Sequence, residues 1–139
     1  MKLSVNNLSA FKGNRQIAML TAYNCPIARY LEQIGIPVIL VGDTLAMVEM
    51  GHSNTRSVTV EQMAYHISAV RRGAPNTHII GDLPYLSYET QEDAITHSRL
   101  LIEAGADSIK LEGPKYEIIS SLREEGIEVV GHTGLTPQT

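Results

Sequence analysis

The chain has little of several features that mark particular classes of protein. It contains one cysteine, Cys25, among 139 residues. A single cysteine excludes an intrachain disulfide and is compatible with a reducing cytosol. The longest strongly apolar run, around residues 36–41, is far shorter than the roughly 20 residues that cross a bilayer. The N-terminus also lacks the basic-then-apolar layout of a signal peptide. We therefore expect a soluble, cytoplasmic protein without membrane association.

Positive charge is also scarce. Eleven Lys and Arg residues stand against 15 Asp and Glu, and the net charge at pH 7 is −4. The basic residues are scattered, and the doublet Arg71-Arg72 lies at the end of a helical pattern. Binding to a phosphate backbone requires a basic face, so we expect no nucleic-acid partner. A chain that is 43% hydrophobic and 19% charged has the composition of one globular domain.

A weak internal repeat is the clearest sign of organisation. Three segments, 32–43, 103–112 and 124–132, each contain the tail of a helical pattern, a glycine, a run of β-branched or aliphatic residues and then a polar group. The glycine suits the position just after a helix, where a positive φ is favoured. Repetition at roughly 30 to 40 residues is typical of stacked βα units.

The expected order of elements is strand and helix in alternation. Strands are predicted near residues 17–22, 37–42, 77–82, 107–112 and 127–131, with four helices between them. The stretch 44–58 is the long loop of the set, and long loops in compact domains are often functional.

Capping residues mark where the predicted helices begin. Thr59 and Gln62 have capping-box spacing, and Thr90 can cap the next helix. Pro26 and Pro114 suit the first turn of a helix, where a missing N–H costs nothing.

Three carboxylates, Asp43, Asp82 and Glu112, directly follow predicted strands. In a parallel α/β barrel the carboxyl ends of the strands meet at one pocket, so these acids are expected to converge. Hard oxygen ligands suit Mg²⁺, which takes one or two protein carboxylates together with water and substrate oxygens. A single strand-end Asp is often only a helix cap or a solvated loop residue, but three at matching strand ends favour a functional site.

Two further residues are candidates for the same pocket. Lys110 shares a strand face with Glu112, so the two can form an ion pair without losing a functional role. A lysine is costly to bury without a partner, which indicates function if Lys110 lies inside a barrel. His132 follows the fifth strand and is a candidate to line the pocket.

Five strands and four helices are too few to close a barrel. A (β/α)₈ barrel needs eight strands and about 250 residues. An unclosed parallel sheet also leaves unpaired backbone groups at its last strand, which is a liability. Residues 131–139 have the composition of a loop after a strand. We expect residues 1–139 to be the N-terminal part of a single barrel domain whose C-terminal half is absent.

Several ordered motifs closely resemble those of the ketopantoate hydroxymethyltransferases, also called 3-methyl-2-oxobutanoate hydroxymethyltransferases. They extend from about residue 5 to the end and include Leu40-Val-Gly-Asp43-Thr-Leu-Ala-Met47, Gly51-His52, Tyr65-His66, Ala69-Val-Arg-Arg-Gly-Ala-Pro75, Asp82-Leu-Pro84, Gly105-Ala-Asp-Ser-Ile-Lys110-Leu-Glu112-Gly113 and Gly131-His132-Thr-Gly-Leu-Thr-Pro-Gln138.

The resemblance implies a fold and a reaction. The fold is a TIM barrel of the phosphoenolpyruvate/pyruvate type that uses Mg²⁺. The reaction moves a hydroxymethyl unit from the co-substrate 5,10-methylenetetrahydrofolate to 3-methyl-2-oxobutanoate, the α-ketoacid of valine. The product, 2-dehydropantoate or ketopantoate, is the first intermediate of pantothenate biosynthesis. The resemblance also implies a homo-oligomer, a decamer, acting on small-molecule substrates.

Site residues carry over by position. The resemblance implies that Asp43 and Asp82 are metal ligands and that Glu112 is a further carboxylate of the metal site. Asp43, Thr44, Asp82 and Lys110 match the α-ketoacid-binding positions. Thr44 stands where the family usually has serine, and a hydroxyl is retained. The proton acceptor of the family is a glutamate beyond residue 139, so no catalytic base is expected within this chain, which alone is expected to be inactive.

Two other functions stay open. One is a truncated, non-catalytic fragment that at most binds Mg²⁺ and an α-ketoacid. The other is a metal-dependent carbon–carbon lyase of the same barrel type, because a fold shared by many enzymes does not fix the reaction. The motifs around Asp43, Arg71 and Gly131 favour the transferase.

Overall fold

The computed structural model describes residues 5–138 and contains one parallel sheet. Each strand pairs with the next one in the sequence, in the order expected for the wall of a barrel. All five predicted strands are confirmed, with bounds that shift by one or two residues. They are β1 (Met19–Thr21), β2 (Val38–Val41), β3 (His78–Asp82), β4 (Ser108–Glu112) and β5 (Val129–His132).

The four predicted helices between the strands are also confirmed. They are α2 (Cys25–Gln33), α4 (Val60–Gly73), α5 (Gln91–Glu103) and α6 (Tyr116–Glu124). Three short elements were not predicted, namely α1 (Val5–Ser9), α3 (Leu45–Val48) and the 3₁₀ turn η1 (Thr55–Ser57). The stretch 44–58 is therefore only partly a loop. Its helix α3 forms because Leu45 and Ala46 bury their side chains completely in the core.

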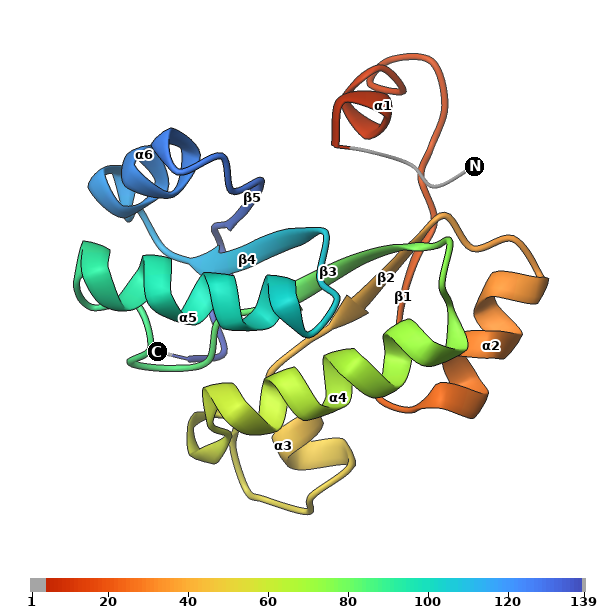
Figure 1. Ribbon diagram of the computed structural model, residues 1–139, viewed down its shortest axis with the longest axis horizontal. Coiled ribbons are helices and arrows are strands. Elements are labelled where there is room, and N and C mark those ends of the chain that lie inside the picture. Colours follow the sequence, from red (N-terminus) through yellow and green to blue (C-terminus); the bar gives the residue numbers. More distant parts are fainter. Residues whose placement is uncertain (1–4, 139) are drawn as a thin grey trace.

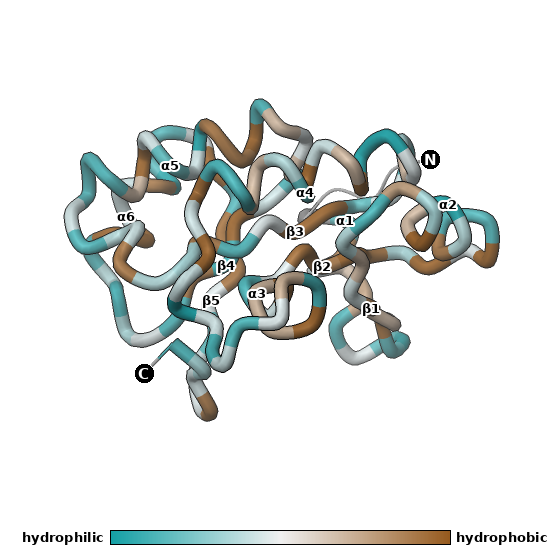
Figure 2. Tube along the Cα trace, turned by 90° about the horizontal axis from the view of Figure 1, so that it is seen from below, coloured by the Kyte–Doolittle hydropathy of each residue, from teal (hydrophilic) through white to brown (hydrophobic). Residues whose placement is uncertain are grey.

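Helices α2, α4, α5 and α6 lie on one face of the sheet, each packed against the next along the chain (Figures 1 and 2). Alternate strand residues point toward these helices and form the core. Those that are fully buried include Ile39, Val41, Ile79, Ile109 and Leu111. The residues between them point to the opposite face. This alternation places Asp82, Lys110 and Glu112 on the side away from the helices.

The predicted helix caps and turn glycines are present. The Thr59 hydroxyl accepts a hydrogen bond from Gln62 N, and the Gln62 side chain accepts one from Thr59 N, which completes the capping box. Thr90 Oγ1 accepts a hydrogen bond from the backbone N–H of Asp93. The glycines of the three repeat segments, Gly35, Gly105 and Gly126, have φ values of +80°, +120° and +75°. A side chain is strained in this conformation, which explains the choice of glycine.

The predicted first-turn positions of Pro26 and Pro114 are confirmed for one proline and wrong for the other. Pro26 lies in the first turn of α2, as predicted. The prediction for Pro114 is wrong, because α6 begins only at Tyr116. Gly113, with φ of +85°, turns the chain away from β4, and Lys115 N donates to Gly113 O at 2.9 Å. This tight three-residue turn delays the helix beyond the proline.

No helix within residues 5–138 is both long enough and apolar enough to span a membrane.

Candidate functional site

The carboxyl ends of β2, β3 and β4 bring the three predicted carboxylates together. Asp43, Asp82 and Glu112 are 2%, 1% and 4% exposed. The backbone N–H of Asp43 donates to Asp82 Oδ2 at 3.2 Å, so the loop after β2 is fixed directly to the end of β3. Buried carboxylates require partners, because ionised groups lose their hydration when they are buried.

Lys110 supplies the cationic partner. Its Nζ lies 2.8 Å and 2.9 Å from the two carboxylate oxygens of Asp82 and 3.4 Å from Glu112 Oε1. Both of the interpretations of Lys110 are therefore compatible with the structure: it pairs with Glu112, but its shorter contacts are to Asp82. Burial lowers the pKa of Lys110, yet the neighbouring carboxylates outweigh burial and the net pKa is raised.

The single positive charge of Lys110 is too small to balance the three carboxyl groups of the site. Burial, opposed by Lys110 and reinforced by Asp43, raises the pKa of Asp82 to about 7. Burial also raises the pKa of Asp43, although its hydrogen bond from Gln138 and the charge of Lys110 oppose the change. Three buried carboxyl groups thus face one lysine. A proton or an added cation at this site relieves the repulsion between Asp43 and Asp82.

His132 and Thr44 take different positions around these acids. His132 is the register partner of Glu112, and its Nδ1 lies 3.1 Å from Glu112 Oε1. Thr44 is the N-cap residue of α3, and its side chain makes no capping hydrogen bond to that helix. The hydroxyl of Thr44 is therefore not used to begin α3.

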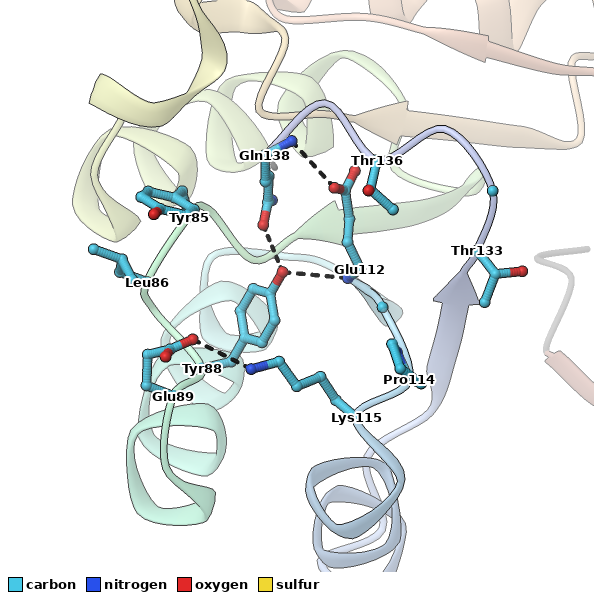
Figure 3. A pocket seen from close by; sticks show the side chains of 12 residues that line it. Tyr85, Leu86, Tyr88, Glu89, Glu112, Pro114, Lys115, Thr133, Thr136 and Gln138 are labelled. Carbon is cyan, nitrogen blue, oxygen red and sulfur yellow. Dashed lines mark hydrogen bonds and ion pairs between the residues drawn. The ribbon is translucent and has the colours of Figure 1, made fainter.

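Gln138, in the loop after β5, lies at the centre of the site and was not among the predicted residues. It is 2% exposed. Its Nε2 donates to Asp43 Oδ2 and to Leu83 O, both at 2.9 Å. Its backbone N donates to Glu112 Oε2 at 3.2 Å (Figure 3). An uncharged amide in a loop gives no signal in a single sequence, because most glutamines of this kind are solvated.

Tyr88 completes the set of contacts. Its hydroxyl donates to Gln138 Oε1 and accepts a hydrogen bond from Glu112 N at 3.3 Å (Figure 3). Burial, with Glu112 and the two aspartates adding to it, raises the pKa of Tyr88 to about 12. The phenol is thus a protonated donor. The structure thus places Tyr88 against two residues of the site.

A family comparison decides where this chain belongs. The sequence profile described as "Ketopantoate hydroxymethyltransferase" matches residues 2–139. The chain belongs to the ketopantoate hydroxymethyltransferase family. Curated proteins named 3-methyl-2-oxobutanoate hydroxymethyltransferase from Thermus thermophilus and Bacillus subtilis are 48% and 46% identical to it, each over 100% of the chain. A probable enzyme of the same name from Schizosaccharomyces pombe is 43% identical over 99% of the chain.

The chain spans about half the length of these relatives. It covers 54%, 52% and 53% of the Thermus, Bacillus and Schizosaccharomyces proteins. All residues of the site lie within residues 2–139, the part of the chain that the family profile matches.

Solved structures identify the fold. 2,3-Dimethylmalate lyase, a member of the PEP mutase/isocitrate lyase superfamily, matches 91% of this chain and 51% of its own with a TM-score of 0.68 at 13% identity. Phosphonopyruvate hydrolase, solved in complex with oxalate and Mg²⁺, matches 82% of this chain and 40% of its own with a TM-score of 0.66 at 15% identity. The predicted TIM-barrel fold is confirmed, and residues 5–138 form five neighbouring parallel strands of such a barrel.

A pocket of about 370 Å³ opens beside Glu112. The loops after β3, β4 and β5 form its walls (Figure 3). Its lining combines aromatic and aliphatic side chains with a few polar ones, among them Tyr85, Leu86, Tyr88, Glu89, Lys115 and Gln138. His132 does not line this pocket, and its predicted part in a pocket at the strand-end carboxylates stays a prediction. Its ring contacts Glu112 instead, and Thr133 forms the wall.

The predicted metal-site residues do not form a ready group of three ligands, but two of them are suitably placed for Mg²⁺. Among residues 5–138, no three His, Cys, Asp or Glu side chains are grouped closely enough to form a ready metal cluster. Glu112 is held by Lys110, His132 and Gln138. Asp82 is also held by Lys110, through both of its oxygens, but Asp43 and Asp82 are adjacent, buried carboxylates beside a single lysine. Mg²⁺ needs only one or two of these, with water and substrate oxygens completing its octahedron, so this pair is a suitable donor set.

Proposed function

We propose that this chain carries the α-ketoacid and metal site of a 3-methyl-2-oxobutanoate hydroxymethyltransferase. The reaction moves a hydroxymethyl unit from 5,10-methylenetetrahydrofolate to 3-methyl-2-oxobutanoate and yields 2-dehydropantoate, the first step of pantothenate biosynthesis. The observation that carries the proposal is the position of Lys110 Nζ between Asp82 and Glu112, next to Asp43 at the strand ends. The relatives that bear this enzyme's name support the choice of reaction.

Asp43 and Asp82 are the residues that would hold Mg²⁺. A bound Mg²⁺ supplies a Lewis acid that polarises the keto group of the substrate and so acidifies the adjacent C–H. Lys110 places a fixed positive charge where the substrate carboxylate would lie. Thr44 offers a hydroxyl to the same substrate. Because the site is buried, these charges act at a lower effective dielectric than in water.

Neither Asp82 nor Glu112 is free to act as the general base. A base must come within about 3 Å of the substrate C–H. The Asp82 carboxylate is held by Lys110, and Glu112 is held by Lys110, His132 and the backbone N–H of Gln138. We therefore propose neither Asp82 nor Glu112 as the proton acceptor of the reaction.

The pocket beside Glu112 supports a site for the second substrate. The rings of Tyr85 and Tyr88 and the side chain of Leu86 give it aromatic and aliphatic walls. Glu89 and Lys115, 3.3 Å apart, provide polar groups at its edge. Sites for small molecules combine apolar walls with a few polar groups in this way. A flat heterocycle, such as the pterin of 5,10-methylenetetrahydrofolate, suits this lining.

Self-association is a further part of the proposal. The outer side of α2 carries a row of apolar residues at helical spacing, Ile27, Tyr30 and Ile34, which are 48%, 70% and 66% exposed. Exposed apolar rows of this kind are typical of protein–protein contacts. They support a homo-oligomer, for which family resemblance suggests a decamer. Light scattering coupled to size-exclusion chromatography tests this, and a monomer at all concentrations would contradict it.

Hydroxymethyl transfer by the chain itself tests the proposed reaction. The chain is incubated with Mg²⁺, 3-methyl-2-oxobutanoate and 5,10-methylenetetrahydrofolate, and 2-dehydropantoate is measured by mass spectrometry. Mg²⁺-dependent binding of 3-methyl-2-oxobutanoate that is lost in a folded Lys110→Met chain supports the proposed site, and product formation supports the transfer reaction itself. If neither product nor Mg²⁺-dependent ketoacid binding is found, the proposal is rejected.

A second candidate is a non-catalytic part of such an enzyme that only binds its ligands. The partners that hold the Asp82 and Glu112 carboxylates, and so leave neither of them free to accept a proton, favour it. Binding of 3-methyl-2-oxobutanoate that requires Mg²⁺ but yields no product would support this candidate. Cleavage of a dimethylmalate in place of transfer would instead support a lyase of the same barrel type.

A further inference from the structure

Gln138 contacts Asp43 and Glu112, two of the predicted metal-site carboxylates, and two residues of the segment after β3. Its side-chain amide joins Asp43 to Leu83 and Tyr88, and its backbone N–H bonds to Glu112. We propose that Gln138 is a positioning residue that holds the Asp43 carboxylate through Oδ2, leaves Oδ1 to a divalent cation, and thereby favours Mg²⁺ over the larger Ca²⁺. This inference rests on the magnesium site of the proposed function.

The contacts of the amide determine which of its ends faces Asp43. Leu83 O can only accept a hydrogen bond, so the group beside it must be the NH₂ of Gln138, whose two N–H donors reach Leu83 O and Asp43 Oδ2. The Tyr88 hydroxyl donates to the other end, Gln138 Oε1. The raised pKa of Tyr88 keeps this phenol protonated. A rotated amide would lose all three bonds at once.

The main chain around Gln138 is held on two sides. Its backbone N–H donates to Glu112 Oε2 at 3.2 Å, and Thr55 Oγ1 donates to the neighbouring Pro137 O at 3.4 Å. Thr55 belongs to the 3₁₀ turn η1, and Glu112 ends β4. With 2% of its surface exposed, Gln138 has no room to exchange its partners for water. A fully satisfied, buried network of this kind is rigid.

The expected preference for Mg²⁺ follows from which carboxylate oxygens of Asp43 and Asp82 are left without a hydrogen bond. Both oxygens of Asp82 contact Lys110, and Oδ2 of Asp43 contacts Gln138. Within residues 5–138, Asp43 Oδ1 is the one oxygen of these two carboxyl groups that accepts no hydrogen bond from an N–H group or a hydroxyl, and the Asp82 carboxyl lies close to the Asp43 side chain. Ca²⁺ takes six to eight oxygens and often both oxygens of one carboxylate, whereas Mg²⁺ takes fewer protein ligands and keeps several waters. A carboxylate held through one oxygen therefore suits Mg²⁺ better.

Titration calorimetry with MgCl₂ and CaCl₂ tests this selectivity on the whole chain. Gln138→Met keeps the length of the side chain and removes its three hydrogen bonds, while the backbone contact to Glu112 is retained. We expect Mg²⁺ affinity to fall by about tenfold or more, as is typical when an outer partner of a ligand is removed. Ca²⁺ affinity should fall less, so that the ratio of the two affinities drops by about tenfold. Gln33→Met, at an exposed position on α2, is the matched control and should change neither affinity.

A second variant keeps the test decisive if Gln138→Met does not fold. Tyr88→Phe removes only the hydroxyl that holds Gln138 Oε1, and it should lower the Mg²⁺/Ca²⁺ ratio in the same direction by a smaller factor. An unchanged ratio in both variants, or in Tyr88→Phe alone where Gln138→Met is unfolded, would overturn the role of Gln138 and leave the magnesium site intact. If the unmodified chain binds no Mg²⁺, both the site and this inference are rejected.

Discussion

Asp82 and Lys110 are register partners on β3 and β4, and the Lys110 ammonium contacts both oxygens of the Asp82 carboxylate at 2.8 Å and 2.9 Å. Their side chains are 2% and 13% exposed. Burying two ions costs several kcal/mol for each, and only their mutual contact offsets this cost. The pair is thus stable with both partners present and unfavourable with one.

Replacing the lysine alone should destabilise the fold. We expect Lys110→Met to lower the free energy of unfolding by about 3 kcal/mol, because it leaves Asp82 and Glu112 buried without their cation. Urea denaturation at pH 7 measures the change. In the double variant Asp82→Asn/Lys110→Met the loss should be smaller than the sum of the two single losses. Lys115→Met, which removes a half-exposed ion pair, is the control and should cost at most about 1 kcal/mol. Equal losses in Lys110→Met and Lys115→Met would contradict the prediction.

Magnesium binding should weaken as the pH falls below 7. The pKa of Asp82 is raised to about 7, mainly by burial, so in the metal-free protein this carboxyl is largely protonated at pH 6 and largely ionised at pH 8. A metal ion binds the ionised form and must displace the proton at low pH. We expect the affinity for Mg²⁺ to be about tenfold higher at pH 8 than at pH 6. Calorimetry in buffers of different ionisation enthalpy should also show proton release that decreases toward pH 8. Equal affinity across this range would contradict the raised pKa.

The arrangement of strands and helices could be predicted because its signals are local. Alternating apolar residues, the capping box at Thr59 and the glycines after α2, α5 and α6 each determine a short segment by themselves. The errors occur where distant contacts decide the structure. Helix α3 depends on burial of Leu45 and Ala46 in the core, and the delayed start of α6 depends on the turn at Gly113.

The candidate site was predictable only in part, for a related reason. Asp43, Asp82 and Glu112 are charged residues at strand ends, and parallel strands bring their ends to one edge. Gln138 lies 95 residues from Asp43 in the sequence, and only the return of the loop after β5 brings its amide to that carboxylate. No local pattern distinguishes this glutamine from a solvated one.

Glu32 makes stability depend on pH at the opposite end of the sheet. From α2 its carboxylate accepts hydrogen bonds from the backbone N–H groups of Asn76 and Thr77 at 2.9 Å and 3.0 Å and from the Thr77 hydroxyl at 3.0 Å. Burial opposes ionisation, but these bonds outweigh it, and the pKa of Glu32 is lowered below its ordinary value. The ionised carboxylate thus stabilises the turn between α4 and β3.

The sign of the pH dependence follows from that lowered pKa. The stabilisation is present above the pKa that Glu32 has in the unfolded chain and is lost as the pH falls through its lower pKa in the folded protein. We expect Glu32→Gln to lower the free energy of unfolding at pH 7 by about 1 kcal/mol. The difference from the unmodified chain should shrink as the pH is lowered through the acidic range in urea titrations. Glu124→Gln, at an exposed position on α6, should have no such effect, and a pH-independent difference for Glu32→Gln would contradict the assignment.

Arg71 connects the end of α4 to the starts of β3 and β4. Its guanidinium donates to the carbonyl oxygens of Gly105, Ala74 and Thr77 at 2.8 Å to 2.9 Å and to Asp107 Oδ2 at 2.6 Å. Its neighbour Arg72 is exposed, and its guanidinium donates a hydrogen bond to Ser68 Oγ at 3.3 Å. The same substitution can thus be made at a partly buried arginine, Arg71, and at its exposed neighbour, Arg72.

Arg71→Lys should be far more destabilising than Arg72→Lys. A lysine ammonium is compact and cannot reproduce the planar fork that reaches carbonyl groups on two sides. Several buried carbonyl oxygens would lose their donors at once, so we expect a loss of about 2–4 kcal/mol in the free energy of unfolding. Arg72→Lys should stay within about 0.5 kcal/mol of the unmodified chain. Because Arg71 lies at the amino ends of the strands and the carboxylates at their carboxyl ends, Arg71→Lys that remains folded should bind Mg²⁺ with unchanged affinity. Similar stabilities for the two variants, measured by urea denaturation, would show that the guanidinium contacts are replaceable.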